Sequence, residues 1–147
     1  MDRINFLKRF LTSGLLLTLP RIVDASLQKG KSEHWNEILI YTDNVAGFGF
    51  YKGAQLMSDM KPDDALDLVR EPDNPYDHNA IAVYWQGEKI GFMPRIDNLI
   101  LAAILDAKLP CEAFISGIYP EADTWNKLQF SINLLYPMDY LAKEKMV

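Results

Sequence analysis

Apolar and polar residues alternate with a period of two in several stretches after residue 36, and this period is typical of β-strands. The alternating stretches predict strands over residues 37–45, 65–70, 81–85, 89–93, 111–119 and 127–136. Gln86-Gly87 predicts a two-residue hairpin connection. Phe50 and Tyr51 are expected to extend the first strand beyond Gly47 and Gly49, where we expect a bulge or a close backbone approach.

One long helix is predicted over residues 95–108, and a shorter helical turn within residues 53–60. Pro94 suits the first turn of the long helix, and Pro110 stops it. Apolar residues recur on one face of this helix, and we expect this apolar stripe to pack into the core; it comprises Ile96, Leu99, Ile100, Ala103, Ile104 and Ala107. The pattern therefore predicts a mainly β domain with one or two helices, arranged as a small barrel.

The length and composition fit one packed domain. The chain has 147 residues, of which 49% are hydrophobic and 12% aromatic, which is enough for a single core. We predict the domain over residues 37–137, a polar leader or linker over 26–36 and a C-terminal tail over 138–147. The only cysteine, Cys111, is expected to be a buried, inert thiol. No spacing of His and Cys fits a zinc site, so no metal or cofactor is predicted.

The first 25 residues have the layout of a secretory signal peptide. Basic residues among the first nine positions precede the apolar run 10–19, Pro20 ends this run, and small residues follow at 23–25. The run is shorter than the about 20 residues that a membrane span needs, so no transmembrane span is predicted. The alternative is an amphipathic helix that docks on the domain or on a partner.

A polar, proline-containing turn separates the second predicted strand from the third. Pro72 and Pro75 fix their own backbone angles and favour an extended conformation in the residues before them. Asn74 and Asp77 can bond to neighbouring backbone groups. We therefore expect a rigid surface loop that presents Tyr76 beside the Asp77 carboxylate, which is a candidate binding site.

This turn also carries a family resemblance. It reads Arg70-Glu71-Pro72-x-Asn74-Pro75-Tyr76-Asp77-x-Asn79-Ala80-Ile81, which resembles the signature of the HIRAN domain. Two further motifs resemble the same family, namely Val45-Ala46-Gly47 with Phe50-Tyr51-x-Gly53, and Ile90-Gly91-Phe92-Met93-Pro94-Arg95. The resemblance covers residues 38–136 and implies an OB-like barrel. Since no motor or RING motif accompanies it, it implies a stand-alone member of bacterial type.

The resemblance implies a non-enzymatic module that captures the 3′-hydroxyl end of single-stranded DNA. A carboxylate only accepts hydrogen bonds, so Asp77 would accept the proton of a terminal hydroxyl and repel a terminal phosphate. Aromatic rings would stack on bases, and Lys52 or Lys89 would meet phosphates. The nucleic-acid-binding residues that the resemblance implies are Phe50, Tyr51, Lys52, Asn74, Tyr76, Asp77 and Arg95.

Each of these residues also has a structural alternative. Asp77 can be a turn-capping carboxylate bonded to backbone, and Asn74 can likewise be structural. By residue type Phe50 favours the core, and Arg95 can form a surface ion pair with Glu88 or Asp97. Tyr76 can lie over the rim of the barrel, and both Trp85 and Trp125 are expected in the core or as cross-strand residues.

Two departures from the family's sequence pattern, together with the net charge of the chain, leave a second hypothesis open. Gly49 and Phe92 stand where DNA-binding members of the family carry an arginine and a histidine, which removes two donors. The formal net charge of −5 also argues against nonspecific binding of nucleic acid. The alternative is an exported domain that binds a protein or glycan ligand in the cell envelope. The N-terminus indicates export, whereas the family's role indicates the cytoplasm.

Overall fold

The computed structural model describes residues 35–138. The predicted signal-peptide-like segment, most of the leader and all but the first residue of the predicted tail lie outside the described residues. Residues 36–136 form one compact unit. Its strands are β1 (Trp35–Asn44), β2 (Ala65–Arg70), β3 (Ile81–Trp85), β4 (Glu88–Phe92), β5 (Cys111–Ile118) and β6 (Leu128–Pro137). Its helices are η1 (Phe48–Phe50), α2 (Gly53–Leu56), η2 (Met57–Asp59) and α3 (Asn98–Asp106), of which η1 and η2 are 3₁₀ turns.

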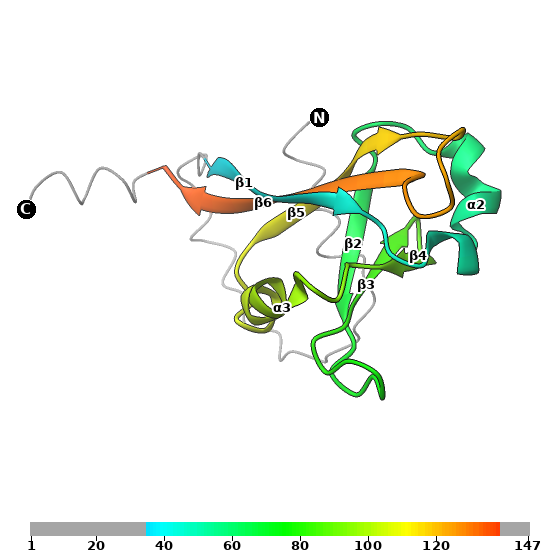
Figure 1. Ribbon diagram of the computed structural model, residues 1–147. Coiled ribbons are helices and arrows are strands. Elements are labelled where there is room, and N and C mark those ends of the chain that lie inside the picture. The colour runs from blue at the N-terminus through cyan, green and yellow to red at the C-terminus, as the bar shows by residue number, and fades with distance from the viewer. Residues whose placement is uncertain (1–34, 139–147) are drawn as a thin grey trace, which may run out of the picture. The chain divides into compact units, whose positions relative to one another are not determined.

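The strands form one sheet in the order β1-β6-β5-β2-β3-β4 (Figure 1). The mainly β fold is confirmed, and the predicted strands agree with the observed ones to within one or two residues. The hairpin between β3 and β4 is confirmed as well, since Gln86 and Gly87 both have positive φ, at 47° and 84°, as a tight primed turn requires. By contrast, Phe50 and Tyr51 do not extend β1, because the chain turns into η1.

A single bridge joins the two outer strands of the sheet. Just beyond β1, the Ala46 N–H donates to the carbonyl of Phe92 in β4 at 2.8 Å, and the Phe92 N–H donates to the carbonyl of Ala46 at 2.9 Å. No longer strand pairing accompanies this bridge within residues 35–138. The sheet is therefore an open OB-like barrel whose edges meet at one residue pair.

The core lies between the inward faces of these strands. Ile81, Val83, Ile90, Ile115 and Ile132 are among its fully buried side chains. Along β5, buried and half-buried residues alternate with the period of two that is typical of a strand. Trp85 is buried, as one of its two alternatives predicted, and its indole N–H donates to Asp64 at 3.0 Å. Cys111 is half-buried, and burial raises the pKa of its thiol.

The predicted orientation of the long helix was wrong. Helix α3 begins at Asn98 and ends at Asp106, and it buries Asn98, Leu101 and Ala102. Most residues of the predicted core stripe face solvent instead, since Ile96 is 90%, Leu99 66% and Ile100 72% exposed. Ile104 is the exception, because it is half-buried and packs against the core. In residues 99–105 every side chain is apolar, so hydrophobicity alone could not select a face. No helix in the described part of the chain is long and apolar enough to span a membrane.

Truncation of two neighbouring residues of α3 tests this orientation. Leu101→Ala removes a core side chain, so we expect it to lower the free energy of unfolding by about 2–5 kcal/mol. Ile100→Ala removes a side chain that already lies in solvent, so we expect a change within about 0.5 kcal/mol. Urea denaturation followed by circular dichroism measures both values. Equal losses for the two variants would contradict the orientation.

Candidate nucleic-acid interface

The loop over residues 71–80, between β2 and β3, is held by a dense set of hydrogen bonds. The Glu71 N–H donates to the carbonyl of Ala80 at 3.0 Å, which closes the base of the loop. The Arg70 guanidinium donates to the carbonyls of Ala80 at 2.7 Å and His78 at 3.1 Å. The same guanidinium pairs with Asp106 of α3 at 2.9 Å. The side chain of Arg70 therefore connects the C-terminal part of the loop to α3.

Asn74 and Asp77 serve the loop itself. In the side chain of Asn74, Oδ1 accepts the N–H of Tyr76 at 3.0 Å and Nδ2 donates to Glu71 Oε2 at 3.1 Å. In Asp77, Oδ1 accepts the N–H of Asn79 at 2.9 Å and Oδ2 accepts the side-chain amide of Asn98 at 2.6 Å. These contacts match the structural alternatives for both residues. They leave the ring of Tyr76 83% exposed at the tip of the loop.

A half-buried ion pair connects this loop to β4. Lys89 Nζ lies 2.6 Å from Glu71 Oε1, 4.1 Å from the ring centre of Phe92 and 5.4 Å from that of Tyr51. Tyr51 and Phe92 are themselves in edge contact at 5.8 Å. Burial acts to raise the pKa of Glu71, but hydrogen bonds from Lys89 and Asn74, together with the charge of Lys89, outweigh it and lower the pKa.

Two exposed aromatic rings lie together beside η1. Phe50 is 77% and Trp125 61% exposed, and their ring centres are 6.0 Å apart. The expectations that Phe50 favours the core and that Trp125 is a core or cross-strand residue were therefore wrong. Trp125 lies in the loop between β5 and β6, where Asp123 Oδ1 accepts the N–H groups of Trp125 and Asn126, both at 3.1 Å. That Asp-x-Trp-Asn turn is the sequence signal that could have placed Trp125 at the surface.

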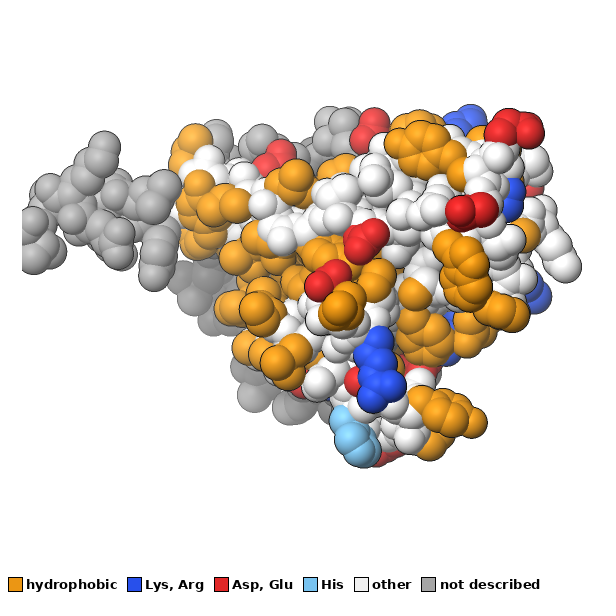
Figure 2. Space-filling view, viewed as in Figure 1, with side chains coloured by type: hydrophobic (Ala, Val, Ile, Leu, Met, Phe, Trp, Pro, Cys, Tyr) orange, Lys and Arg blue, Asp and Glu red, His pale blue; other side chains and the backbone are white. Residues whose placement is uncertain are grey.

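Gly49 permits the approach of these two rings. A Cβ atom at Gly49 would lie 2.4 Å from Cγ2 of Thr124, the residue before Trp125. A side chain at position 49 would therefore require the Thr124 side chain to move. On the face shown in Figure 2, hydrophobic side chains are exposed beside α2 and this loop, and separately over α3.

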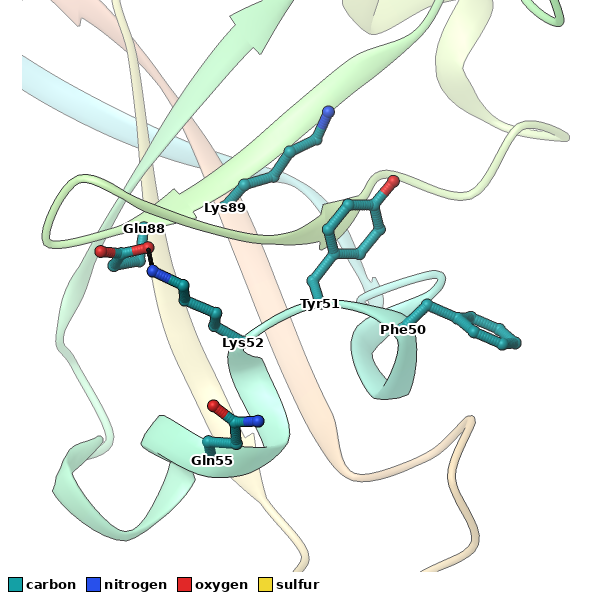
Figure 3. Close-up of a pocket in the computed structure, with 6 residues that line it drawn as sticks. All are labelled: Phe50, Tyr51, Lys52, Gln55, Glu88 and Lys89. Atoms are coloured by element: carbon teal, nitrogen blue, oxygen red, sulfur yellow. Dashed lines mark ion pairs between the residues drawn. The ribbon is translucent and has the colours of Figure 1, made fainter.

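A shallow depression of about 420 Å³ adjoins the aromatic pair and is lined by Phe50, Tyr51, Lys52, Gln55, Glu88 and Lys89 (Figure 3). Lys52 Nζ lies 2.8 Å from Glu88 Oε2. Three of the predicted site residues, Phe50, Tyr51 and Lys52, therefore meet here.

Arg95 lies apart from this depression, just before α3. Its side chain is exposed and makes no hydrogen bond or ion pair with any other residue between 35 and 138. Its expected partners are engaged elsewhere, since Glu88 pairs with Lys52 and Asp97 accepts the hydroxyl of Tyr41 at 3.4 Å. Arg95 is thus a cation available to a ligand. The contacts link Tyr51 through Lys89 and Glu71 to the loop, while the rings of Tyr76 and Phe50 do not touch.

Comparison with known proteins decides the family. Residues 41–135 match the family model of the HIRAN domain. The chain belongs to the HIRAN domain family. The Helicase-like transcription factor of Oryctolagus cuniculus is 37% identical over 78 residues, which are 52% of this chain and 7% of that protein. This chain therefore covers only a small part of the length of that relative.

Two solved structures share the fold. A protein from Lactobacillus plantarum has a TM-score of 0.60 at 21% identity, with 69% of this chain and 98% of that one covered. The HIRAN domain of human HLTF has a TM-score of 0.55 at 23% identity, with 70% and 82% covered. The resemblance of the sequence motifs and the OB-like fold are thereby confirmed.

The Glu71–Lys89 pair makes part of the stability depend on pH. Because the pKa of Glu71 is lowered on folding, its contribution is complete above the unfolded value of about 4.5 and is lost as the pH falls through the lower folded value. We expect Glu71→Gln to lower the free energy of unfolding by about 1 kcal/mol at neutral pH. At a pH below both values wild type and variant should be equally stable.

Urea denaturation across this pH range measures the difference between wild type and Glu71→Gln. Glu121→Gln is the control, since it removes the same charge from an exposed side chain without a bond to another residue in the range 35–138. A difference between wild type and Glu71→Gln that is the same at neutral and strongly acidic pH would show that the ion pair is not its source.

Proposed function

We propose that this HIRAN domain is a non-enzymatic nucleic-acid-binding module that holds the 3′-hydroxyl end of single-stranded DNA. Family membership gives the class of ligand, and the exposed aromatic rings are the single observation that carries the proposal. Large rings seldom remain in water without a use when they gather on one surface. Phe50, Trp125 and Tyr76 are all more than half exposed, and they are held at the surface by turns rather than by core packing.

Stacking provides the main attraction in this proposal. Every base has a π-face, so aromatic platforms bind single strands without reading their sequence, at about 1–3 kcal/mol per base. Phe50 and Trp125 are in tilted contact, at 58° to each other, and are 77% and 61% exposed, so both rings are accessible to a base. Tyr76 offers a separate ring on the loop.

Asp77 acts as the acceptor for the terminal hydroxyl. Each carboxylate oxygen has two lone pairs, and each oxygen of Asp77 uses one of them, toward Asn79 or Asn98. A lone pair therefore remains on each oxygen, on a side chain whose orientation is already fixed. The negative charge disfavours a terminal phosphate at the same place. Arg95 and Lys52 supply the contacts to phosphate.

The envelope hypothesis rests on residues 1–25, which lie outside the described residues. Binding of a protein or glycan would not depend on the chemistry of a DNA end. Failure of the DNA-binding tests below would therefore leave the envelope hypothesis as the alternative.

The end preference tests the role of Asp77. We expect wild type to bind an oligothymidylate with a 3′-hydroxyl about tenfold or more tightly than the same strand with a 3′-phosphate, because one hydrogen bond to a charged acceptor is gained and a repulsion is avoided. Asp77→Asn keeps the size of the side chain but removes its charge, and the preference should vanish. Fluorescence anisotropy with labelled strands measures both affinities.

Asp73→Asn serves as the matched control for Asp77→Asn, because it removes one charge from an exposed side chain of the same loop that has no hydrogen bond or ion pair with another residue in the range 35–138. In this variant the preference for the hydroxyl end should survive. Equal affinity of wild type for both ends, or no affinity for either, would refute the capture of the 3′ end.

The aromatic platform is tested by truncation. We expect Phe50→Ala and Trp125→Ala each to weaken binding of the 3′-hydroxyl strand by about 5- to 150-fold, the range that corresponds to one lost stacking contact. Because both rings are exposed, the free energy of unfolding should change by no more than about 0.5 kcal/mol. Ile96→Ala is the control, as Ile96 is still more exposed but has no ring. If all three variants bind like wild type, the platform does not hold the strand.

A further inference from the structure

The two lysines of the depression are each paired with a glutamate, but the two ion pairs differ in character. The Lys89–Glu71 pair is half-buried, with side chains 24% and 28% exposed. Lys89 also lies over two rings, and Glu71 accepts the amide of Asn74. This pair is built into the support of the 71–80 loop, so a ligand could not separate it without loosening that loop.

The Lys52–Glu88 pair, by contrast, does not hold another described segment of the chain in place. Its side chains are 62% and 45% exposed, and neither of them makes a further hydrogen bond or ion pair with a residue in the range 35–138. Figure 3 shows the two side chains meeting across one end of the depression, while Phe50 points away from them at the other. An exposed ion pair of this kind contributes little to stability, so it can open at small cost.

We propose that Glu88 is an intramolecular competitor for Lys52, which it occupies until a nucleic-acid phosphate enters the depression and takes the lysine over. This inference rests on the proposed function. A phosphate and a carboxylate offer a lysine ammonium the same kind of charged acceptor. The strand gains by releasing a counterion when its phosphate is neutralised. After the exchange, Glu88 stays beside the phosphate and repels it.

Glu88 therefore lowers the affinity for a polyanion without contacting it favourably. It also discriminates between classes of ligand, because an uncharged molecule such as a glycan would not compete for Lys52. The position of the lysine next to Phe50 and Tyr51 puts the exchange where a stacked nucleotide carries its phosphate.

Removal of the competing charge tests the inference. We expect Glu88→Gln to bind a labelled oligothymidylate about two- to fivefold more tightly than wild type, as an exposed pair of this strength allows. The dependence of affinity on salt should also become steeper, since Lys52 then neutralises a phosphate without an opposing charge. Asp67→Asn is the matched control, because it removes one exposed negative charge on β2 that has no bond to a lysine among the described residues. It should change the affinity less than Glu88→Gln does.

A double-mutant cycle with Lys52→Gln gives the decisive result. In that background Glu88→Gln should change affinity no more than Asp67→Asn does. If the full gain persists without Lys52, or if Glu88→Gln and Asp67→Asn act alike in wild type, the competition is refuted. A second experiment uses inorganic tripolyphosphate as the ligand. Its binding is measured by the shifts of the backbone amide signals of Lys52 and Gln55 in nuclear magnetic resonance spectra.

This second experiment separates the inference from the proposed function. If no variant binds the oligonucleotide but tripolyphosphate shifts these signals more strongly in Glu88→Gln than in Asp67→Asn, the DNA proposal fails and the competition stands. If tripolyphosphate shifts them equally in both variants, the competition fails whatever the DNA result.

Discussion

The hydrogen bond from the Asn98 amide to the Asp77 carboxylate, at 2.6 Å, joins the 71–80 loop to α3 at a buried position. Asn98 is 2% exposed, so its amide cannot reach water and must find a partner inside the protein. Because that partner sits on the loop, the helix turns its Asn98 side toward the loop. Leu101 and Ala102 then face the core, while Leu99 and Ile100 are left in solvent. Because residues 99–105 are all apolar, any rotation of α3 leaves some apolar side chains in solvent, and the observed rotation also satisfies the buried amide of Asn98.

The closure of the barrel organises the second half of the site. Gly91 has a φ of 150°, and a Cβ atom there would lie 2.4 Å from the carbonyl oxygen of Ala46. Glycine is therefore required where β4 meets the chain beyond β1. The bridge between Ala46 and Phe92 places the following turn, η1, beside β4. Tyr51, which follows η1, packs there against Phe92 and Lys89. The glycine of the Ile-Gly-Phe motif thus has a structural reason that is independent of any ligand.

The sequence predicted correctly those features whose physical causes lie within a few residues along the chain. The strands and the Gln86-Gly87 hairpin follow from a period of two and from turn chemistry within a few residues, and they agree with the structure. The face of α3 was set by a contact 21 residues away along the chain, and no local pattern contains it. Residue type placed Phe50 and Trp125 in the core, whereas both rings lie at the surface in the turns of η1 and of the β5–β6 loop, where they contact each other. The loop residues were identified correctly as a rigidly bonded group, but the partner of Asp77 was not foreseen.

The charge distribution then determines what kind of nucleic-acid binder this fold can be. A chain with a formal net charge of −5 has no broad positive field to collect DNA. The site also neutralises its own lysines, since Lys52 and Lys89 each hold a glutamate. Few phosphates can therefore be bound at once, and long-range attraction cannot drive association. In the proposed function, attraction comes from short-range contacts, namely ring stacking and hydrogen bonds to the Asp77 carboxylate. Such contacts require bases and an end that are free of a complementary strand, and a continuous duplex offers neither. The negative net charge and the exposed rings are therefore consistent with the proposed preference for ends of single strands over duplex DNA.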